Sequence, residues 1–194
     1  MNTHAARSRA PHRKACAAAL LAAAGLLALP ALAGHLNIVL TADLDGRSEV
    51  ATGASDQRIV GDPRGRGEAY VFGIDGDTRT LCYVLQVERI AELEQGPGNG
   101  RMAHIHRGRA GENGPVVVTL AWPQDGQAAD CISEDRILPS GAPAFARDPA
   151  TGQPLAPASE ILMEPEEYYV NVHNQAYPAG AVRGQLRDNL QPRR

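Results

Sequence analysis

The chain has 194 residues, of which 43% are hydrophobic and 21% are charged, and its formal net charge is −3. This composition is too apolar for a wholly disordered chain and too polar for a protein with many membrane spans. The near-neutral charge gives no reason to expect a nucleic-acid partner. Twenty Gly and 14 Pro beside two Phe, one Trp and five Tyr indicate many turns, which favours a β-rich fold over a helical bundle.

Residues 1–33 have the layout of a secretory signal peptide. Four basic residues precede an apolar run rich in Ala and Leu, Ala15–Leu29, and Pro30 separates that run from the small residues of Ala31-Leu32-Ala33. We therefore predict cleavage after Ala33 and export to the periplasm or to the cell exterior. The apolar run is short for a membrane anchor, so no span is expected after cleavage. Removing residues 1–33 takes away four of the 19 basic residues and no acidic one, which changes the net charge from −3 to −7.

Alternation of apolar and polar residues predicts roughly eight short strands in the remaining chain. The first covers residues 36–44, and a shorter one is predicted near residues 49–52. A hairpin follows from Gly67, with Asp75-Gly76-Asp77 as its turn. One face of its return strand carries Leu81, Tyr83, Leu85 and Val87.

Four further strands are predicted at residues 102–107, 116–120, 168–173 and 181–186. Residues 123–160 are rich in Pro and Ala and are expected to be irregular, and residues 189–194 form a polar tail. The number and shortness of the strands predict an all-β fold, an antiparallel β-sandwich or Greek-key barrel.

Two cysteines, Cys82 and Cys131, remain after the predicted cleavage, because Cys16 lies within the signal peptide. An exported chain with an even pair of thiols most simply forms one disulfide, so we predict a Cys82–Cys131 bond. The alternatives are two free buried thiols or a pair of soft metal ligands.

Two segments, taken together, resemble the chordin-type (CHRD) domain. The first comprises residues 103–108, Ala-His-Ile-His-Arg-Gly, and continues through residues 113–120. The second comprises residues 168–173, Tyr-Tyr-Val-Asn-Val-His, then Tyr177-Pro178 and residues 181–186. The resemblance is to short exported bacterial proteins of this family. It implies an all-β sandwich that is immunoglobulin-like or similar to Cu/Zn superoxide dismutase.

The resemblance covers residues 36–187 and places one CHRD domain at residues 34–188. The Pro- and Ala-rich stretch at about residues 138–160 departs from the usual pattern and looks like an insertion before the second motif.

The two motifs also carry three of the four histidines that follow the signal peptide. His104 and His106 are two residues apart, so on a strand their side chains point to one face. The later strand presents Tyr169, Asn171 and His173 together on one face. Two imidazoles at this spacing can chelate one ion, and His173 from a neighbouring strand would complete a three-nitrogen set for copper, or alternatively zinc. The competing interpretation is that the histidines only bond across strands and order the sheet.

Two weaker ligand candidates stand beside this set. Met102 precedes His104 by two residues, and its thioether suits Cu(I) as an auxiliary ligand. His35 would be the second residue of the mature chain, where the amine, an amide nitrogen and the imidazole can chelate Cu(II). On the last strand, Arg183 is expected to pair with a carboxylate.

These observations predict an exported, non-enzymatic CHRD-domain protein that binds a metal ion through histidines at its surface. A structural or protein-interaction domain is the alternative. A dismutase-like redox enzyme is disfavoured because four mature histidines cannot supply a bridging histidine, a zinc set and a copper set.

Overall fold

The computed structural model describes residues 38–56, 58–91 and 102–188. The predicted signal peptide, His35 and the polar tail therefore lie outside the described residues. Nine strands form one antiparallel sheet: β1 (Val39–Asp45), β2 (Arg66–Ile74), β3 (Asp77–Glu88), β4 (Met102–Arg107), β5 (Val116–Leu120), β6 (Gln127–Ser133), β7 (Tyr168–His173), β8 (Val182–Gln185) and β9 (Arg187–Asp188). The helical elements are η2 (Gln124–Gly126), α1 (Ala158–Met163) and η3 (Pro165–Glu167).

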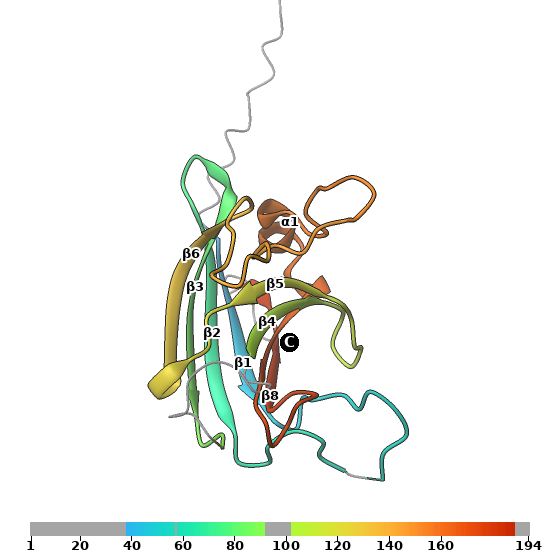
Figure 1. The fold of residues 1–194 in the computed structure, drawn as a ribbon. Coiled ribbons are helices and arrows are strands. Elements are labelled where there is room, and N and C mark those ends of the chain that lie inside the picture. Colours follow the sequence, from blue (N-terminus) through green and yellow to red (C-terminus); the bar gives the residue numbers. More distant parts are fainter. Residues whose placement is uncertain (1–37, 57, 92–101, 189–194) are drawn as a thin grey trace, which may run out of the picture. The chain divides into compact units, whose positions relative to one another are not determined.

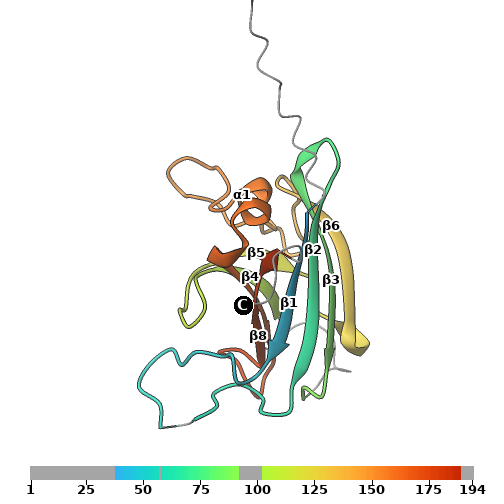
Figure 2. The ribbon, with the colours of Figure 1, turned by 180° about the vertical axis from the view of Figure 1, so that it is seen from behind.

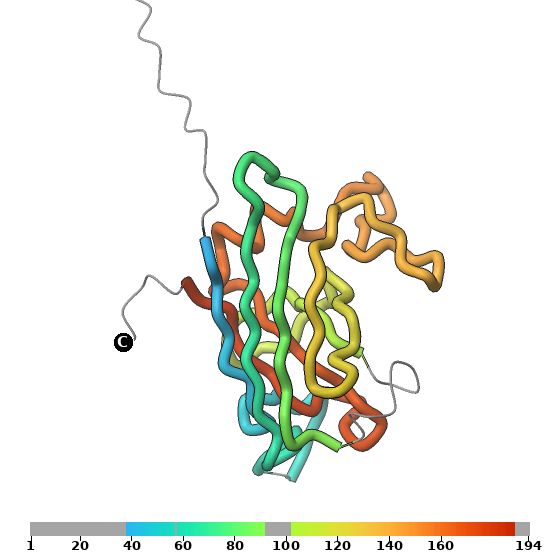
Figure 3. The backbone as a smooth tube through the Cα atoms, turned by 90° about the vertical axis from the view of Figure 1, so that its left-hand side faces the viewer, coloured from blue at the N-terminus to red at the C-terminus, as the bar shows by residue number. Residues whose placement is uncertain are grey.

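The strand order in the sheet is β5-β4-β7-β8-β1-β2-β3-β6, and β9 pairs with β1. The sheet curls so that β1, β2, β3 and β6 form one layer, while β4, β5 and β8 lie in the other (Figures 1 and 2). Figure 3 shows the first layer face on. These features confirm the predicted all-β antiparallel sandwich or barrel.

The core lies between the two layers and is built from alternating side chains. The hairpin of β2 and β3 turns at Gly76, whose φ of 78° is a conformation that favours glycine. On β3 the predicted inward face is buried: Leu81, Tyr83, Leu85 and Val87. Ile105 of β4 and Val170 of β7 are fully buried in the same hydrophobic cluster.

Two sequence predictions are wrong: the strand near residues 49–52 and the irregular character of residues 123–160. Residues 49–52 form no strand. The segment at 123–160 is more ordered than predicted, because it contains β6 and begins α1. Within its Pro- and Ala-rich part, Phe145 is fully buried in the core, and its neighbour Ala144 accepts a backbone hydrogen bond from Thr119 at 2.8 Å.

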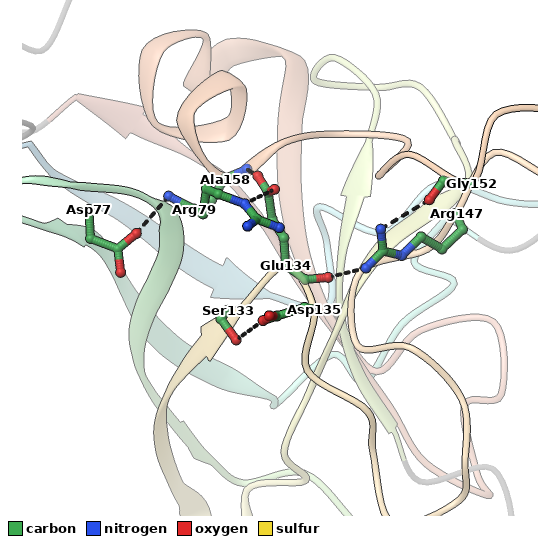
Figure 4. A network of polar contacts seen from close by, with 8 residues as sticks. All are labelled: Asp77, Arg79, Ser133, Glu134, Asp135, Arg147, Gly152 and Ala158. Atoms are coloured by element: carbon green, nitrogen blue, oxygen red, sulfur yellow. Dashed lines mark hydrogen bonds and ion pairs between the residues drawn. The ribbon is translucent and has the colours of Figure 1, made fainter.

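Glu134 anchors this segment to the first layer (Figure 4). Its side chain is 9% exposed and accepts a hydrogen bond from Arg79 Nε at 3.1 Å and another from the Ala158 backbone N–H at 3.0 Å. Its carbonyl oxygen accepts from the Arg147 guanidinium. One buried carboxylate therefore joins β3, the end of β6 and the start of α1.

The predicted disulfide is present between Cys82 of β3 and Cys131 of β6, which are direct partners in the register of these two strands. This bond excludes the alternatives in which these two thiols are free or bind a metal. In the described part of the chain, no helix has the length and hydrophobicity needed to cross a membrane.

Candidate metal centre

Strands β4 and β7 lie side by side and bring the two sequence motifs together. In their register His104 is opposite Asn171, His106 opposite Tyr169, and Met102 opposite His173. Ala103 and Ile105 are buried toward the core, so the histidines of β4 project from the opposite face of the sheet. The prediction that His173 joins His104 and His106 is confirmed.

The three histidines form a compact and buried cluster. Their ring centroids are 5.2 to 5.8 Å apart, and one nitrogen from each lies within 4.8 Å of the others. Each residue is only 7 or 8% exposed to solvent, so the predicted position of the site at the surface is wrong. Among the described residues, this is the group of histidine, cysteine and acidic side chains that could hold a metal ion.

Backbone carbonyls orient two of the imidazoles. His106 Nδ1 lies 3.0 Å from the carbonyl oxygen of Gly114, and His173 Nδ1 lies 3.2 Å from that of Pro178. A carbonyl oxygen only accepts, so Nδ1 carries the proton on both rings and Nε2 keeps its lone pair. His106 Nε2, His173 Nε2 and His104 Nδ1 are buried and have no hydrogen-bond partner. These three atoms are a donor set that fits one metal ion.

Burial keeps these imidazoles neutral. Desolvation, with smaller contributions from His173 and His106, lowers the pKa of His104 from 6.5 to about 3. Desolvation also lowers the pKa of His106 to about 4, against the opposing effect of its bond to Gly114, and lowers the pKa of His173. Neutral imidazole is the form that binds metals, and each neutral ring keeps one nitrogen lone pair at neutral pH. On His106 and His173 the carbonyl contacts assign that lone pair to Nε2.

A loop at residues 108–114 fixes the position of His106. Gly114 accepts the His106 hydrogen bond through its carbonyl oxygen, while its N–H lies 3.3 Å from the hydroxyl of Tyr169. A Cβ atom on Gly114 would come within 1.5 Å of the Arg107 carbonyl oxygen, so only glycine fits there. The sequence placed this loop between two predicted strands and did not mark its role at the site. The adjacent His-x-His motif was the available signal.

Arg183 makes contacts that its prediction did not include. Its guanidinium donates to Asn113 Oδ1 at 3.3 Å and to the carbonyl oxygens of Arg109 and Glu112 at 3.0 and 2.6 Å, while the carboxyl of Glu49 acts on it through charge. It also lies over the Tyr169 ring, 3.4 Å from the centroid. Beside the histidine cluster, the guanidinium of Arg183 is thus stacked on the ring of Tyr169.

Glu49, on the loop between β1 and β2, contacts Asn171, the residue opposite His104. Asn171 Nδ2 donates to Glu49 Oε2 at 3.4 Å, and Glu49 Oε1 is buried without a hydrogen-bond partner. Burial raises the pKa of Glu49 to about 8, although the nearby charge of Arg183 opposes the shift. No sequence pattern marked this residue as part of the site.

Of the two weaker ligand candidates, Met102 and His35, the structure describes only Met102. Met102 is 46% exposed and lies opposite His173 in the register of β4 and β7. His35 lies outside the described residues.

Comparison with protein families matches the CHRD domain to residues 40–186. Neither the search of curated proteins nor the search of solved structures found a match. The matched region spans β1 to β8 and contains all three clustered histidines and both joined cysteines. The chain belongs to the CHRD domain family.

Proposed function

We propose that this CHRD domain is an exported, non-enzymatic metal-binding module, with His104, His106 and His173 as its ligands. The observation that carries the proposal is the buried cluster in which one nitrogen from each histidine lies within 4.8 Å of the others, while each ring also has a buried nitrogen without a hydrogen-bond partner. Leaving buried polar atoms unpaired costs free energy, and a bound ion would remove that cost.

Copper is the favoured metal, and zinc is the alternative. Imidazole nitrogens suit both ions, but the adjacent thioether of Met102 suits Cu(I) and adds little for Zn(II). Met102 therefore serves as an auxiliary ligand in this proposal. His35, with the amine of a mature chain beginning at Gly34, would form a separate Cu(II) site.

Export to the periplasm or to the cell exterior is supported by the character of the first 33 residues and by the disulfide. Disulfides form and persist in oxidising compartments and are rare in the cytosol. The intact mass of protein purified after expression of the full chain should correspond to a chain starting at Gly34. A mass that retains residues 1–33 would contradict cleavage.

Metal analysis tests the proposed ligands. The full chain is expressed, purified, loaded separately with Cu(I), Cu(II) and Zn(II), and dialysed before the bound metal is measured. The wild type should retain about one ion more than the His104→Ala/His106→Ala variant, which keeps one ligand of the triad. His35→Ala removes a histidine from outside the cluster and is the matched control for Cu(I) and Zn(II), while its Cu(II) retention reports on the separate site proposed at the mature N-terminus. Equal metal in the wild type and the double variant would overturn the proposal and favour histidines that only order the sheet.

Met102→Leu tests the choice of metal, because leucine keeps the size of the side chain and removes the sulfur. Weaker Cu(I) retention with unchanged Zn(II) retention would support the auxiliary role. Unchanged retention of both ions would remove Met102 from the ligand set.

A further inference from the structure

Arg183 is a buried cation that is linked to the proposed ligand His106 through the ring of Tyr169. Arg183, on β8, is only 2% exposed, and its guanidinium carbon is 3.4 Å from the centroid of the Tyr169 ring. The Tyr169 ring is also stacked with the ring of His106, its partner on β4, with 4.8 Å between the ring centroids and an interplanar angle of 10°. Arg183, Tyr169 and His106 thus form a continuous stack that connects β8, β7 and β4.

The loop at residues 108–114 holds both ends of this stack. Arg183 binds oxygens of Arg109, Glu112 and Asn113 on that loop. Gly114, at the end of the same loop, accepts a hydrogen bond from His106 and donates one to Tyr169. A loss of the Arg183 contacts would therefore remove part of the bonding that holds the loop that orients His106, beside the bonds of this loop to Val50, Ala51 and Glu167.

The guanidinium of Arg183 makes its three hydrogen bonds to neutral oxygens, one amide and two carbonyls. The carboxyls of Glu49 and Glu112 act on it through their charge. Burial raises the pKa of Glu49 to about 8, which reduces the negative charge that this carboxyl carries near neutral pH. The two stacking distances place the guanidinium carbon within about 8 Å of the centre of the His106 ring. A unit charge this close to a proposed ligand repels a bound cation in proportion to the charge of that cation, and burial weakens the screening of this repulsion.

We propose that Arg183 is a positioning residue for His106 and that its buried positive charge makes the site prefer Cu(I) over Cu(II). Cu(I) carries one positive charge fewer than Cu(II), so repulsion from the guanidinium penalises it less. This inference rests on the proposed function and adds the charge state of the metal that the site selects.

Substitutions of Arg183 separate its charge from its contacts. Arg183→Met and Arg183→Gln remove the charge, and the Gln variant retains an amide donor for the loop in case the Met variant does not fold. Arg183→Lys keeps the charge but loses the planar stack and the forked hydrogen bonds. Dissociation constants for Cu(I) and Cu(II) are measured by chelator competition, and the reduction potential of the copper-loaded protein by redox titration.

The Met and Gln variants should each lower the preference for Cu(I) over Cu(II) by about tenfold or more. That change corresponds to a fall of about 60 mV in the one-electron potential. The Lys variant should keep a potential near that of the wild type, while its Cu(II) electron paramagnetic resonance spectrum changes because His106 is less firmly held. Arg187→Met is the matched control, because Arg187 pairs with the exposed carboxylate of Asp43 on β1.

Two results would overturn the inference: an unchanged Cu(I)/Cu(II) preference in the Met and Gln variants, or a Lys variant shifted as far as the Met variant. The second result would indicate a structural role without the effect of charge. Failure of the proposed function is distinguishable from both, since the wild type would then retain no more copper than the His104→Ala/His106→Ala variant.

Discussion

Burial decides the protonation of the three clustered histidines. An imidazole moved out of water loses more solvation as a cation than as a neutral ring, so His104, His106 and His173 stay neutral in the folded state. The carbonyls of Gly114 and Pro178 then decide which nitrogen of His106 and of His173 carries the proton. The site is thereby set for metal binding without any change in protonation at neutral pH.

This burial predicts that acid destabilises the metal-free protein. The pKa values of His104 and His106 are about 3 and about 4 in the folded state, against 6.5 for the unperturbed side chain. Between these values the unfolded chain binds more protons, so the contribution to stability is complete above pH 6.5 and is lost as the pH falls toward 4. The loss should be on the order of a few kcal/mol, measured by urea unfolding at pH 7.5 and pH 4.5. The His104→Asn/His106→Asn variant is the control and should show a shallower dependence on pH. Equal slopes in the two proteins would contradict the prediction.

At the scale of elements, the strands with dense β-branched residues and clear alternation could be predicted from sequence. The predicted bounds of β4, β5 and β7 agree with the structure, as does the inward face of β3. Strand β6 was missed because its sequence, QAADCIS, has a single β-branched residue, and its position beside β3 depends on tertiary pairing. The burial of Phe145 was missed for the same reason, since it follows from packing and leaves no periodic pattern in the chain.

The ligand set was predictable only in part. The spacing of His104 and His106 is a local property of one strand, but the approach of His173 requires β4 and β7 to be neighbours. The residues that hold the histidines in place, Gly114 and Arg183, were harder to identify from the sequence. The role of Gly114 depends on a carbonyl group that every residue has, and the role of Arg183 depends on a ring stack formed across three strands.

The Glu134 anchor gives a prediction about the segment between β6 and α1. Glu134→Ala removes the acceptor for Arg79 and leaves the buried Ala158 N–H without a partner. We expect a loss of about 1–3 kcal/mol in the free energy of unfolding and faster hydrogen exchange at the Ala158 amide. Asp135→Ala is the matched control, because it removes the adjacent exposed carboxylate. An Ala158 exchange rate equal in both variants would contradict the anchoring role.

At the scale of the whole domain, the disulfide and the histidine cluster occupy different strand pairs. Cys82 and Cys131 join β3 to β6, while the histidines lie on β4 and β7. The Cys82→Ala/Cys131→Ala variant should lose about 4 kcal/mol of stability, as the chain-entropy model gives for a closed loop of this length. The sequence separation of the two cysteines is 49 residues. Thermal and urea unfolding measure this loss, and metal retention by the folded variant should stay at the wild-type level. A variant that is equally stable, or one that is folded but loses the metal, would contradict this separation.

The bond between the two cysteines also determines which donors an incoming metal ion meets. Copper(I) binds thiolates strongly, and a free cysteine would compete with imidazole for it. Within the described residues both sulfhydryl groups are consumed in the disulfide, so an ion entering the proposed site would meet imidazole and thioether donors instead. Oxidative maturation of the domain would thus direct a soft ion to the histidines and keep metal loading from interfering with cysteine pairing.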